Sequence, residues 1–341
     1  MRFRGPRDGG RRTTRLTRMA AVVVAATVLA GCASAVALTR AAGPEAVGHE
    51  LATVARAQSP AGPWQVAWVT PSLELTGVRV FGPQDVWVAA SDGRIYAWDG
   101  TGWHVQRLDD DLGAMAAVSP RDVWVSSDDG IRHWDGAHWS LTSHDGSVTA
   151  LAASDARHVW AGDPTGIRTW TGTSWVRQYA AADADVRAIA APDATHAWAV
   201  GSLPDGSGVI VAWNGTRWSV QATTTQPLSA IYAAGPEHAW AVSTEGTIYG
   251  WNGRTWSATA DVHLPLTAVT GIDATHVWAV AQSGEILALH GVTWTVAYRA
   301  PTTLTGIAAL DPSSVWAIGF DTIYSTVDQG SAPSSWTTSG L

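Results

Sequence analysis

A tryptophan-centred unit returns seven times along this chain at a nearly constant interval. Successive units lie 36 to 42 residues apart, and their leading tryptophans are Trp87, Trp124, Trp160, Trp198, Trp240, Trp278 and Trp316. A fixed period of roughly 20–50 residues is typical of solenoids, propellers and other repeat arrays. The period therefore limits the possible folds more than any other feature, although a repeat alone predicts no ligand and no reaction.

Each unit divides into four short runs separated by turn residues. In the fifth unit the runs cover 227–234, 239–242, 247–251 and 254–258. Short runs rich in β-branched and aromatic residues predict strands, and four strands in about 40 residues are typical of a propeller blade. No unit has the three-and-four apolar spacing of a helical solenoid. The sequence thus predicts an all-β fold, a seven-bladed β-propeller with four antiparallel strands per blade.

A glycine-containing turn is the strongest local signal within the unit. It reads Asp99-Gly100, Asp135-Gly136, Thr171-Gly172, Asn214-Gly215, Asn252-Gly253 and His290-Gly291. Two-residue hairpin turns need positive φ at their central positions, which Asn, Asp and above all Gly tolerate. The dipeptides therefore predict a tight hairpin turn between the third and fourth strands of each blade.

The abundance of tryptophan has two interpretations. The chain holds 21 Trp but only 3 Phe and 6 Tyr, and in most units two tryptophans flank the glycine turn, as Trp98 and Trp103 do. The rings either pack between neighbouring blades or form an aromatic platform for sugars and other flat ligands. Packing is favoured because the rings follow the blade period, and each buried ring removes about 150–250 Å² from water.

Two segments compete for the fourth strand of the last blade. Residues 63–70, which include Trp64, precede the first unit much as Trp256 precedes the sixth, whereas residues 335–338, which include Trp336, follow the last unit. If the first segment completes the blade, both chain ends latch the ring. If the second does, residues 63–70 become an extra edge. The sequence leaves both open, and a closed ring keeps only short, protected edges in either case.

The N-terminus has the pattern of an export signal. Seven arginines precede an apolar run, Met19 to Ala30, which is too short for a stable membrane span and suits a signal peptide. The run ends in Leu29, Ala30, Gly31 and Cys32, which resemble the lipobox of bacterial lipoproteins in all four positions. The resemblance implies cleavage before Cys32, a lipid on its sulfur, and a place on the extracytoplasmic face of the cell membrane. An ordinary signal peptide and an uncleaved anchor helix are the alternatives.

Composition excludes one class of partner. The chain has 21 basic residues, all of them Arg, and without residues 1–31 it keeps 14 Arg against 28 Asp plus Glu. A chain this acidic, with no basic stripe, is a poor candidate for binding nucleic acid.

Anionic lipid headgroups would also repel so acidic a chain, so membrane attachment depends on the acyl chains of the anchor. Since Cys32 is the only cysteine, the ring must persist on packing without disulfides.

These signals divide the chain into three parts. We expect a lipoprotein signal peptide over 1–31, the lipidated Cys32 and a flexible Ala-rich tether over 32–62, and the propeller over 63–341. The expected blades cover about 75–111, 112–146, 147–184, 185–226, 227–264, 265–302 and 303–341.

No recognisable catalytic motif is present. The nucleophile elbow, the His-Glu-x-x-His pair, the phosphate loop and the dinucleotide fingerprint are all missing. The first strands, which should line the central channel, are nearly uncharged apart from Arg79 and Arg187. We therefore predict no catalytic residue, no cofactor and a protein that is not an enzyme.

Four histidines recur two residues before a leading tryptophan: His158, His196, His238 and His276. They either bind a metal or cap the turn that precedes the second strand. Zinc requires its ligands to converge within about 2.0–2.1 Å, whereas equivalent positions on different blades lie apart on a ring. The pattern favours capping and predicts no metal site.

Acidic residues gather in loops of one predicted face. Asp109, Asp110, Asp111 and Asp145 lie in links between units, which share that face with the loops between second and third strands. The sequence therefore predicts a strongly negative face. It is either a solvated rim that maintains solubility or a surface for a cationic partner or Ca²⁺.

One loop breaks the repeat. The fourth unit carries eight residues, 201–208, around Pro204, Asp205 and Gly206, where its neighbours carry four or five. Insertions in repeat proteins map to loops on one face, often the binding face. These three residues are the candidate binding loop, and a neutral insertion is the alternative.

The unit as a whole resembles a known group of propellers. Over about residues 75–341 the pattern Leu-Thr-x-Ile, Asp-x-x-His/Asp-x-Trp-x-Val-Gly, Gly-x-Ile-Tyr and Trp-Asn-Gly-x-x-Trp is similar to bacterial WD/YVTN/BNR-like propellers. Residues 270–280 with 284–286 also resemble tectonin-type repeats, some of which belong to lectins. Photosystem assembly-factor propellers have a similar unit, but their Asp-Gly-Gly-x-x-Trp box is absent here. These resemblances imply the fold and leave the function open.

Three functions are compatible with these features. The preferred one is a membrane-anchored, extracytoplasmic lipoprotein whose propeller is a non-catalytic scaffold that binds or assembles an envelope protein. The second is a tectonin-like, carbohydrate-binding lectin, which requires solvent-exposed tryptophans near the loops. The third is a glycan-active hydrolase or lyase, which requires charged side chains that converge in the channel.

Overall fold

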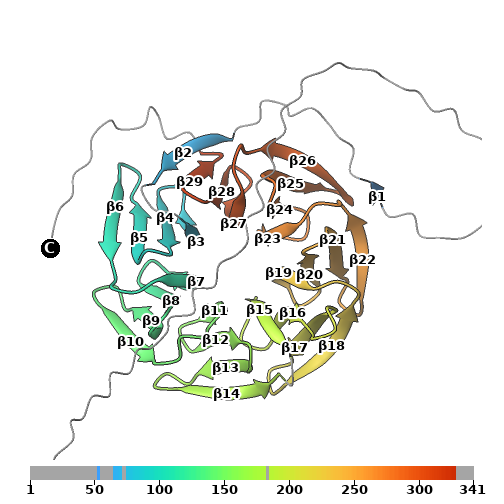
Figure 1. Cartoon of the computed structure of the whole chain (residues 1–341), viewed down its shortest axis with the longest axis horizontal. Coiled ribbons are helices and arrows are strands. Elements are labelled where there is room, and N and C mark those ends of the chain that lie inside the picture. The colour runs from blue at the N-terminus through green and yellow to red at the C-terminus, as the bar shows by residue number, and fades with distance from the viewer. Residues whose placement is uncertain (1–51, 54–63, 71–73, 182–183, 328–341) are drawn as a thin grey trace, which may run out of the picture. The chain divides into compact units, whose positions relative to one another are not determined.

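Seven antiparallel sheets surround a central axis in the computed structural model, which describes residues 52–53, 64–70, 74–181 and 184–327 (Figure 1). Each sheet holds four strands that follow one another outward from the axis, and one sheet has a fifth strand. The predicted all-β, seven-bladed propeller is confirmed. The lipobox, Cys32, most of the tether and Trp336 lie outside the described residues, and no helix within those residues could span a bilayer.

In the first four blades the strands run outward from the axis in chain order. Blade 1 contains β3 (Leu75–Gly82), β4 (Asp85–Ala90), β5 (Arg94–Trp98) and β6 (Trp103–Arg107). Blade 2 contains β7 (Leu112–Ser119), β8 (Asp122–Ser127), β9 (Gly130–Trp134) and β10 (Trp139–Ser143). Blade 3 contains β11 (Ala150–Asp155), β12 (His158–Asp163), β13 (Gly166–Trp170) and β14 (Trp175–Ala180). Blade 4 contains β15 (Asp185–Ala190), β16 (Ala197–Ser202), β17 (Gly208–Trp213) and β18 (Trp218–Thr224).

The remaining blades are also described from the axis outward. Blade 5 contains β19 (Leu228–Gly235), β20 (His238–Ser243), β21 (Thr247–Trp251) and β22 (Trp256–Asp261), with β1 (Ala52–Thr53) parallel to β22 on its outer edge. Blade 6 contains β23 (Leu266–Gly271), β24 (Val277–Ala281), β25 (Glu285–His290) and β26 (Thr293–Arg299). Blade 7 contains β27 (Leu304–Asp311), β28 (Ser314–Gly319), β29 (Thr322–Ser325) and β2 (Gln65–Val69).

The second strand of every blade is the centre of the core. In blade 1, Val86, Trp87, Val88, Ala89 and Ala90 are all buried, with no alternation between the faces of the sheet. A strand reads as a continuous apolar run when both faces of its sheet are covered. Here the two neighbouring blades pack against the two faces of the sheet. This packing explains the recurring Val-Trp-Val and Ala-Trp-Ala runs.

The turn between the third and fourth strands differs from its predicted form. In blade 1 the N–H of Asp99 donates to the carbonyl of Gly102 at 3.3 Å, so the two central residues are Gly100 and Thr101. Gly100 has φ 88°, and the only non-glycine residue with positive φ among those described is His263. Asp99 instead precedes the turn, and its carboxylate accepts the N–H groups of Thr101 and Gly102. Glycine at the first central position, as in a type II′ turn, suits the twist of the strands.

Tryptophan triads hold neighbouring blades together. The ring of Trp124 in blade 2 lies 5.3 Å from that of Trp170 and 5.7 Å from that of Trp175, the pair that flanks the glycine turn of blade 3. Trp87 contacts the corresponding pair of blade 2, at 6.2 and 6.5 Å. Tilted and edge-to-face pairs at these separations contribute beyond the area they bury. Each leading tryptophan therefore completes the core of the next blade as well as its own.

The N-terminal segment closes the ring, which resolves the two alternatives that the sequence left open. Strand β2 pairs with β29 in antiparallel register, with Gln65 opposite Ser325 and Trp68 opposite Ile323. Trp64 is 9% exposed, and its ring stacks 6.1 Å from that of Tyr298 in blade 6. The N-terminal segment thus supplies both the fourth strand of blade 7 and the tryptophan that precedes it.

A second set of contacts joins the inner strands. At the closing junction the hydroxyl of Thr305 in blade 7 donates to the carbonyl of Leu75 in blade 1 at 2.9 Å. Ser229 and Thr267 make the same bond in blades 5 and 6, to the carbonyls of Leu266 and Leu304 at 2.7 and 2.9 Å. The junction between blades 7 and 1 therefore contains the same hydroxyl-to-carbonyl hydrogen bond as two internal junctions. The ring is closed at this point by the same kind of contact that joins its other blades.

Closure by β2 predicts a specific mutational asymmetry. Trp64→Ala removes the buried ring that the closing segment packs against blade 6, and it is expected to lower the free energy of unfolding by about 3–5 kcal/mol. Trp336→Ala is the matched control and is expected to change it by less than about 0.5 kcal/mol. Urea unfolding of both variants checks this, and a large loss for Trp336→Ala with none for Trp64→Ala would contradict the closure.

Candidate interaction surfaces

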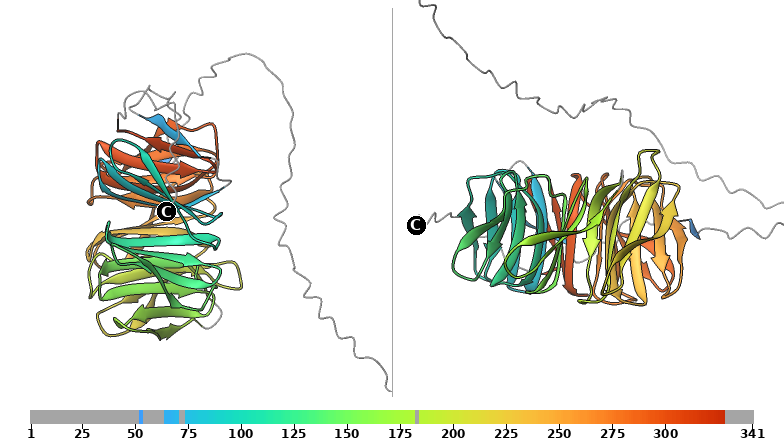
Figure 2. Two further views of the ribbon diagram at one scale, coloured as in Figure 1. Left: turned by 90° about the vertical axis from the view of Figure 1, so that its left-hand side faces the viewer. Right: turned by 90° about the horizontal axis from the view of Figure 1, so that it is seen from below.

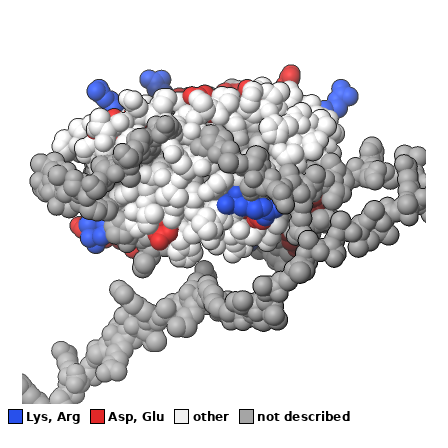
Figure 3. Space-filling model, turned by 90° about the horizontal axis from the view of Figure 1, so that it is seen from above, with Lys and Arg blue, Asp and Glu red and all other residues white. Residues whose placement is uncertain are grey.

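The ring has two faces with different connections. The turns from first to second strand and from third to fourth strand lie on one face, called the turn face. The hairpins from second to third strand and the links between blades lie on the other, called the loop face. Figure 2 shows the ring edge-on between these faces, and in Figure 3 most charged side chains follow the two faces while the visible outer wall is largely uncharged. The two faces are therefore the candidate sites for polar recognition.

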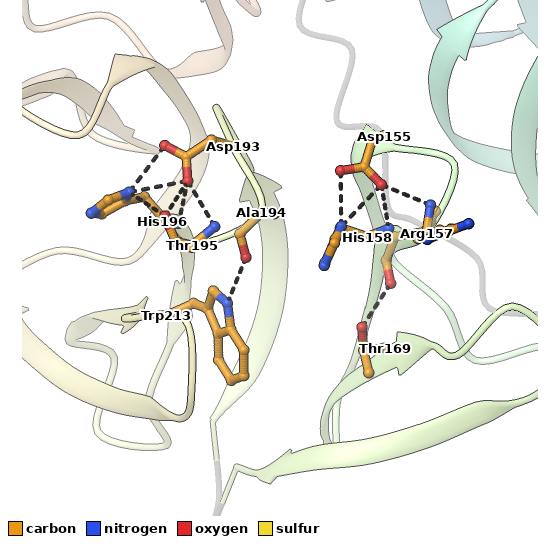
Figure 4. A network of polar contacts seen from close by, with 10 residues as sticks. Asp155, Arg157, His158, Thr169, Asp193, Ala194, Thr195, His196 and Trp213 are labelled. Atoms are coloured by element: carbon orange, nitrogen blue, oxygen red, sulfur yellow. Dashed lines mark hydrogen bonds and ion pairs between the residues drawn. The ribbon is translucent and has the colours of Figure 1, made fainter.

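The recurring histidines belong to a repeated turn on the turn face. Asp193 accepts the backbone N–H groups of Thr195 and His196 at 2.7 and 2.8 Å, and its carboxylate also contacts Nδ1 of His196 at 3.0 Å (Figure 4). Asp155 and His158 form the same pair at 2.8 Å. The predicted capping role is therefore corrected in one respect: the aspartate caps the backbone, and the histidine ring closes onto the aspartate.

The same turn recurs in blade 6 and is absent from blade 5. Asp273 accepts the N–H groups of Thr275 and His276 at 2.7 and 2.8 Å, and its carboxylate contacts Nδ1 of His276 at 2.9 Å. In blade 5 Gly235 takes the place of the aspartate, while His238 stacks on Trp240 as His276 stacks on Trp278. Among the residues that the structure describes, no three His, Cys, Asp or Glu side chains are arranged to hold a metal ion.

The predicted negative loop face is partly neutralised by arginines. Arg132 of blade 2 pairs with Asp110 in the link that precedes it, and its Nε–H donates to that carboxylate at 2.7 Å. Arg168 of blade 3 repeats this contact with Asp145 and also lies 3.1 Å from the buried Asp163. In blade 6, Arg299 pairs with Glu285. Of the four predicted acidic residues, Asp110 and Asp145 are therefore ion-paired, whereas Asp109 and Asp111 are exposed.

An excess of negative charge remains on the loop face after this pairing. Its described arginines are Arg94, Arg107, Arg132, Arg168, Arg177, Arg187 and Arg299. Its described carboxylates are Glu74, Asp92, Asp109, Asp110, Asp111, Asp128, Asp129, Asp145, Asp163, Asp185, Asp205, Glu245, Asp261, Glu285 and Asp321. Such a surface attracts cations and basic surfaces over distances of about a Debye length.

The inserted loop forms an extended hairpin on the loop face. Pairing between β16 and β17 runs to Ser202 and Gly208, and the N–H of Leu203 then donates to the carbonyl of Ser207 at 2.8 Å. Pro204, Asp205 and Gly206 are exposed at its tip. In the edge-on view a yellow-green hairpin of this blade extends past the neighbouring loops (Figure 2). The hairpin is thus an ordered projection of the sheet.

The two arginines that the sequence predicts at the channel lie on the first strands of blades 1 and 4. Arg79 on β3 donates to the carbonyls of Val78 and Met115, so its guanidinium bridges blades 1 and 2, and burial lowers its pKa to about 10. Arg187 on β15 lies 3.4 Å from Asp185 of its own strand. The two arginines that the sequence predicts at the channel therefore have separate partners, one of them structural.

Tryptophans are covered throughout the described part of the chain. Those buried below a tenth exposure are Trp64, Trp87, Trp98, Trp124, Trp160, Trp198, Trp218, Trp240, Trp278, Trp294 and Trp316. The other described tryptophans are half-buried. Of the two interpretations, packing between blades therefore agrees with the structure. The large exposed aromatic side chain is instead Phe320, 52% exposed in the hairpin between β28 and β29 on the loop face.

Comparisons with known proteins bear on the fold. No family model matches the sequence, and no curated protein matches it. The chain is similar to YCF48 bound to a D1 peptide, with a TM-score of 0.63 and 16% identity over 78% of this chain and 97% of that one. It is also similar to the WD40 repeats of RRP9, with a TM-score of 0.65 and 14% identity over 79% and 98% of the two chains.

A third solved structure leads to the same class. The WD40 β-propeller domain of Doa1 superposes with a TM-score of 0.64 and 13% identity, over 77% of this chain and 96% of that one. Identities this low define the fold and carry no function. The protein has the fold of a seven-bladed β-propeller.

The capped carboxylates predict acid sensitivity. The pKa of Asp273 is lowered because the backbone N–H of Thr275, its hydroxyl and His276 all stabilise the carboxylate. Since the folded-state pKa lies below the ordinary value near 3.9, this stabilisation is complete above about pH 4 and is lost as the pH falls through the folded pKa. Urea unfolding between about pH 7 and pH 2.5 should show stability falling below about pH 4.

Two aspartate variants test whether the capped turns cause this fall. Asp273→Asn is expected to make the fall shallower, because it removes a titrating cap. Asp109→Asn removes an exposed loop-face carboxylate and is expected to keep the wild-type slope. Identical slopes for wild type and Asp273→Asn would contradict the assignment.

Proposed function

We propose that this protein is a membrane-anchored, extracytoplasmic lipoprotein whose propeller is a non-catalytic scaffold for a protein partner. The observation that carries the proposal is the loop face. It combines an ordered hairpin that breaks the repeat, the exposed ring of Phe320 and an excess of carboxylates, all on a closed ring. An apolar anchor surrounded by polar groups is typical of protein recognition sites.

The charge of the loop face selects the kind of partner. Asp109, Asp111, Asp205 and Glu245 are exposed there, so a complementary protein would present basic side chains. Electrostatic complementarity of this kind accelerates association and discriminates between partners. The superposition on a propeller described as bound to a D1 peptide supports the idea that this architecture can hold a polypeptide, and the fold itself hosts many functions.

The alternative functions have less support. A lectin that stacks sugars on tryptophan needs exposed rings, and every described tryptophan is buried or half-buried. A hydrolase or lyase in the channel needs convergent charged groups, and Arg79 and Arg187 instead have partners of their own. The lectin therefore stays second and the enzyme third.

Anchoring rests on the sequence. Cys32 ends a lipobox-like motif and is the only cysteine. A single lipidated terminus would hold the ring at the membrane surface without crossing it. Because β2 is the outer strand of blade 7, a tether that ends at Trp64 would join the ring at its outer wall. Both faces would then stay accessible to partners.

Crosslinking and capture from native membranes test the scaffold. The mature protein with Cys32 intact is expected to capture a discrete basic protein. Replacing residues 203–207 by the three residues 244–246 of blade 5 should reduce capture at least about tenfold, because the projecting contact is lost. Glu237→Gln on the turn face is the matched control and should retain capture. Enrichment of glycan without a protein partner would reject the scaffold in favour of the lectin.

The Cys32→Ala variant separates anchoring from recognition. It is expected to lose membrane association and the mass of an attached lipid, while the purified protein still binds the captured partner. Membrane association that persists without Cys32 would contradict the lipid anchor and would leave the scaffold role intact.

A further inference from the structure

Histidines are segregated on one face of the ring. The turn face holds His104, His133, His138, His158, His196, His238, His276 and His290, whereas the loop face holds His144 and His263. Each turn-face histidine lies in a turn or at the end of a strand adjoining one. The segregation crosses six of the seven blades, so it is a property of the face and not of one loop.

Fixed charges on the turn face are few enough for these histidines to reverse its sign. Among its described residues the nine carboxylates are Asp85, Asp99, Asp122, Asp135, Asp155, Asp193, Glu237, Asp273 and Asp311, and the four arginines are Arg121, Arg157, Arg217 and Arg254. The formal charge is thus −5 with neutral imidazoles and +3 when all eight are protonated. The described part of the loop face has fifteen carboxylates, seven arginines and two histidines, so its formal charge stays negative when both histidines are protonated.

Most of the turn-face histidines lie beside carboxylates. His104, His133, His158, His196 and His276 each contact an aspartate, at 2.6 to 3.0 Å. His138 follows Asp135 in the same turn, across which Arg121 packs, and His238 follows Glu237. Histidine is the side chain whose charge ordinarily changes between about pH 5 and 8.

We propose that the turn face is an acid-activated docking surface for an anionic lipid bilayer. The charges that appear on acidification are spread around the ring and do not converge on a pocket, which suits a planar array of headgroups. This step rests on the proposed lipid anchor for its setting, because a tethered ring already lies near a bilayer and weak attraction is then sufficient. In neutral conditions both faces are negative and the ring stands away from the membrane. In acid the turn face lies on it and the loop face points outward.

Vesicle flotation tests this with the unlipidated Cys32→Ala chain, so that failure of the anchor and failure of the docking are distinguishable. Binding to phosphatidylglycerol vesicles is expected to be at least about tenfold stronger at about pH 5.5 than at about pH 7.5, because basic groups near an anionic surface each add attraction. Phosphatidylcholine vesicles should show no such gain. Raising the salt concentration should remove it, since screening shortens the reach of surface charges.

Matched variants assign the effect to one face. His138→Gln, His238→Gln and His290→Gln together remove three turn-face charges, which lowers the formal charge in acid from +3 to zero. This triple variant is expected to lose the gain at about pH 5.5. The loop-face control, His144→Gln with His263→Gln, should keep it. Thermal unfolding at the same pH verifies that both variants are folded.

Three outcomes would overturn the proposal. The first is equal vesicle binding at both pH values. The second is a pH-dependent gain that survives in the triple turn-face variant or disappears in the loop-face control. The third is an equal gain on phosphatidylcholine, which would assign the interaction to apolar contact.

Discussion

The tryptophan triad between blades is the interaction on which the rest of the structure depends. In most blades the leading ring packs against the two rings that flank the glycine turn of the next, as Trp124 does with Trp170 and Trp175. Each ring can bury about 150–250 Å², and each is shared between two sheets. A single blade therefore has half a core on each side, and the arrangement is stable only when the circle is complete.

Closure follows from that requirement. The leading Trp316 of the last blade meets Trp103 of the first at 6.1 Å in an edge-to-face contact, which repeats the internal triads. Blade 7 takes its outer strand from the other end of the chain, where β2 supplies it together with Trp64. Since the two ends of the repeat meet in one sheet, the ring has no open edge at the seam, and its rigidity leaves recognition to the two faces.

Most of the fold could be predicted from the sequence. Every blade buries the same kinds of residues at equivalent positions, so the packing produces a repeat that is visible in the sequence. For the turn between third and fourth strands, the sequence predicts the right dipeptides with the wrong geometry. The sequence identifies Gly100 as a turn residue. Only the hydrogen bonds of the structure show that Asp99 precedes the two central residues and caps the turn with its carboxylate. Closure by β2 could not be predicted because the two candidate strands have similar sequences, and register with β29 is what distinguishes them.

The candidate surfaces could be predicted less completely, for a physical reason. Arg132 and Arg168 neutralise Asp110 and Asp145 from strands more than twenty positions away, so the sequence overstates the negative charge of the loop face. Along the sequence the histidines appear as separate caps. Their common face emerges only when the antiparallel order of the strands brings first-to-second and third-to-fourth turns together. The exposure of Phe320 likewise depends on its place in a hairpin.

The most direct test of this account is a crosslink across the proposed seam. In a Cys32→Ala background, Gln65→Cys and Ser325→Cys place two thiols on the paired residues of β2 and β29. The account predicts an intramolecular disulfide that forms in the folded monomer and, by closing a loop of about 260 residues, raises the free energy of unfolding by up to about 4–5 kcal/mol. Thiols that stay free in the folded protein, or that pair only between molecules, would contradict a ring closed by its N-terminal strand.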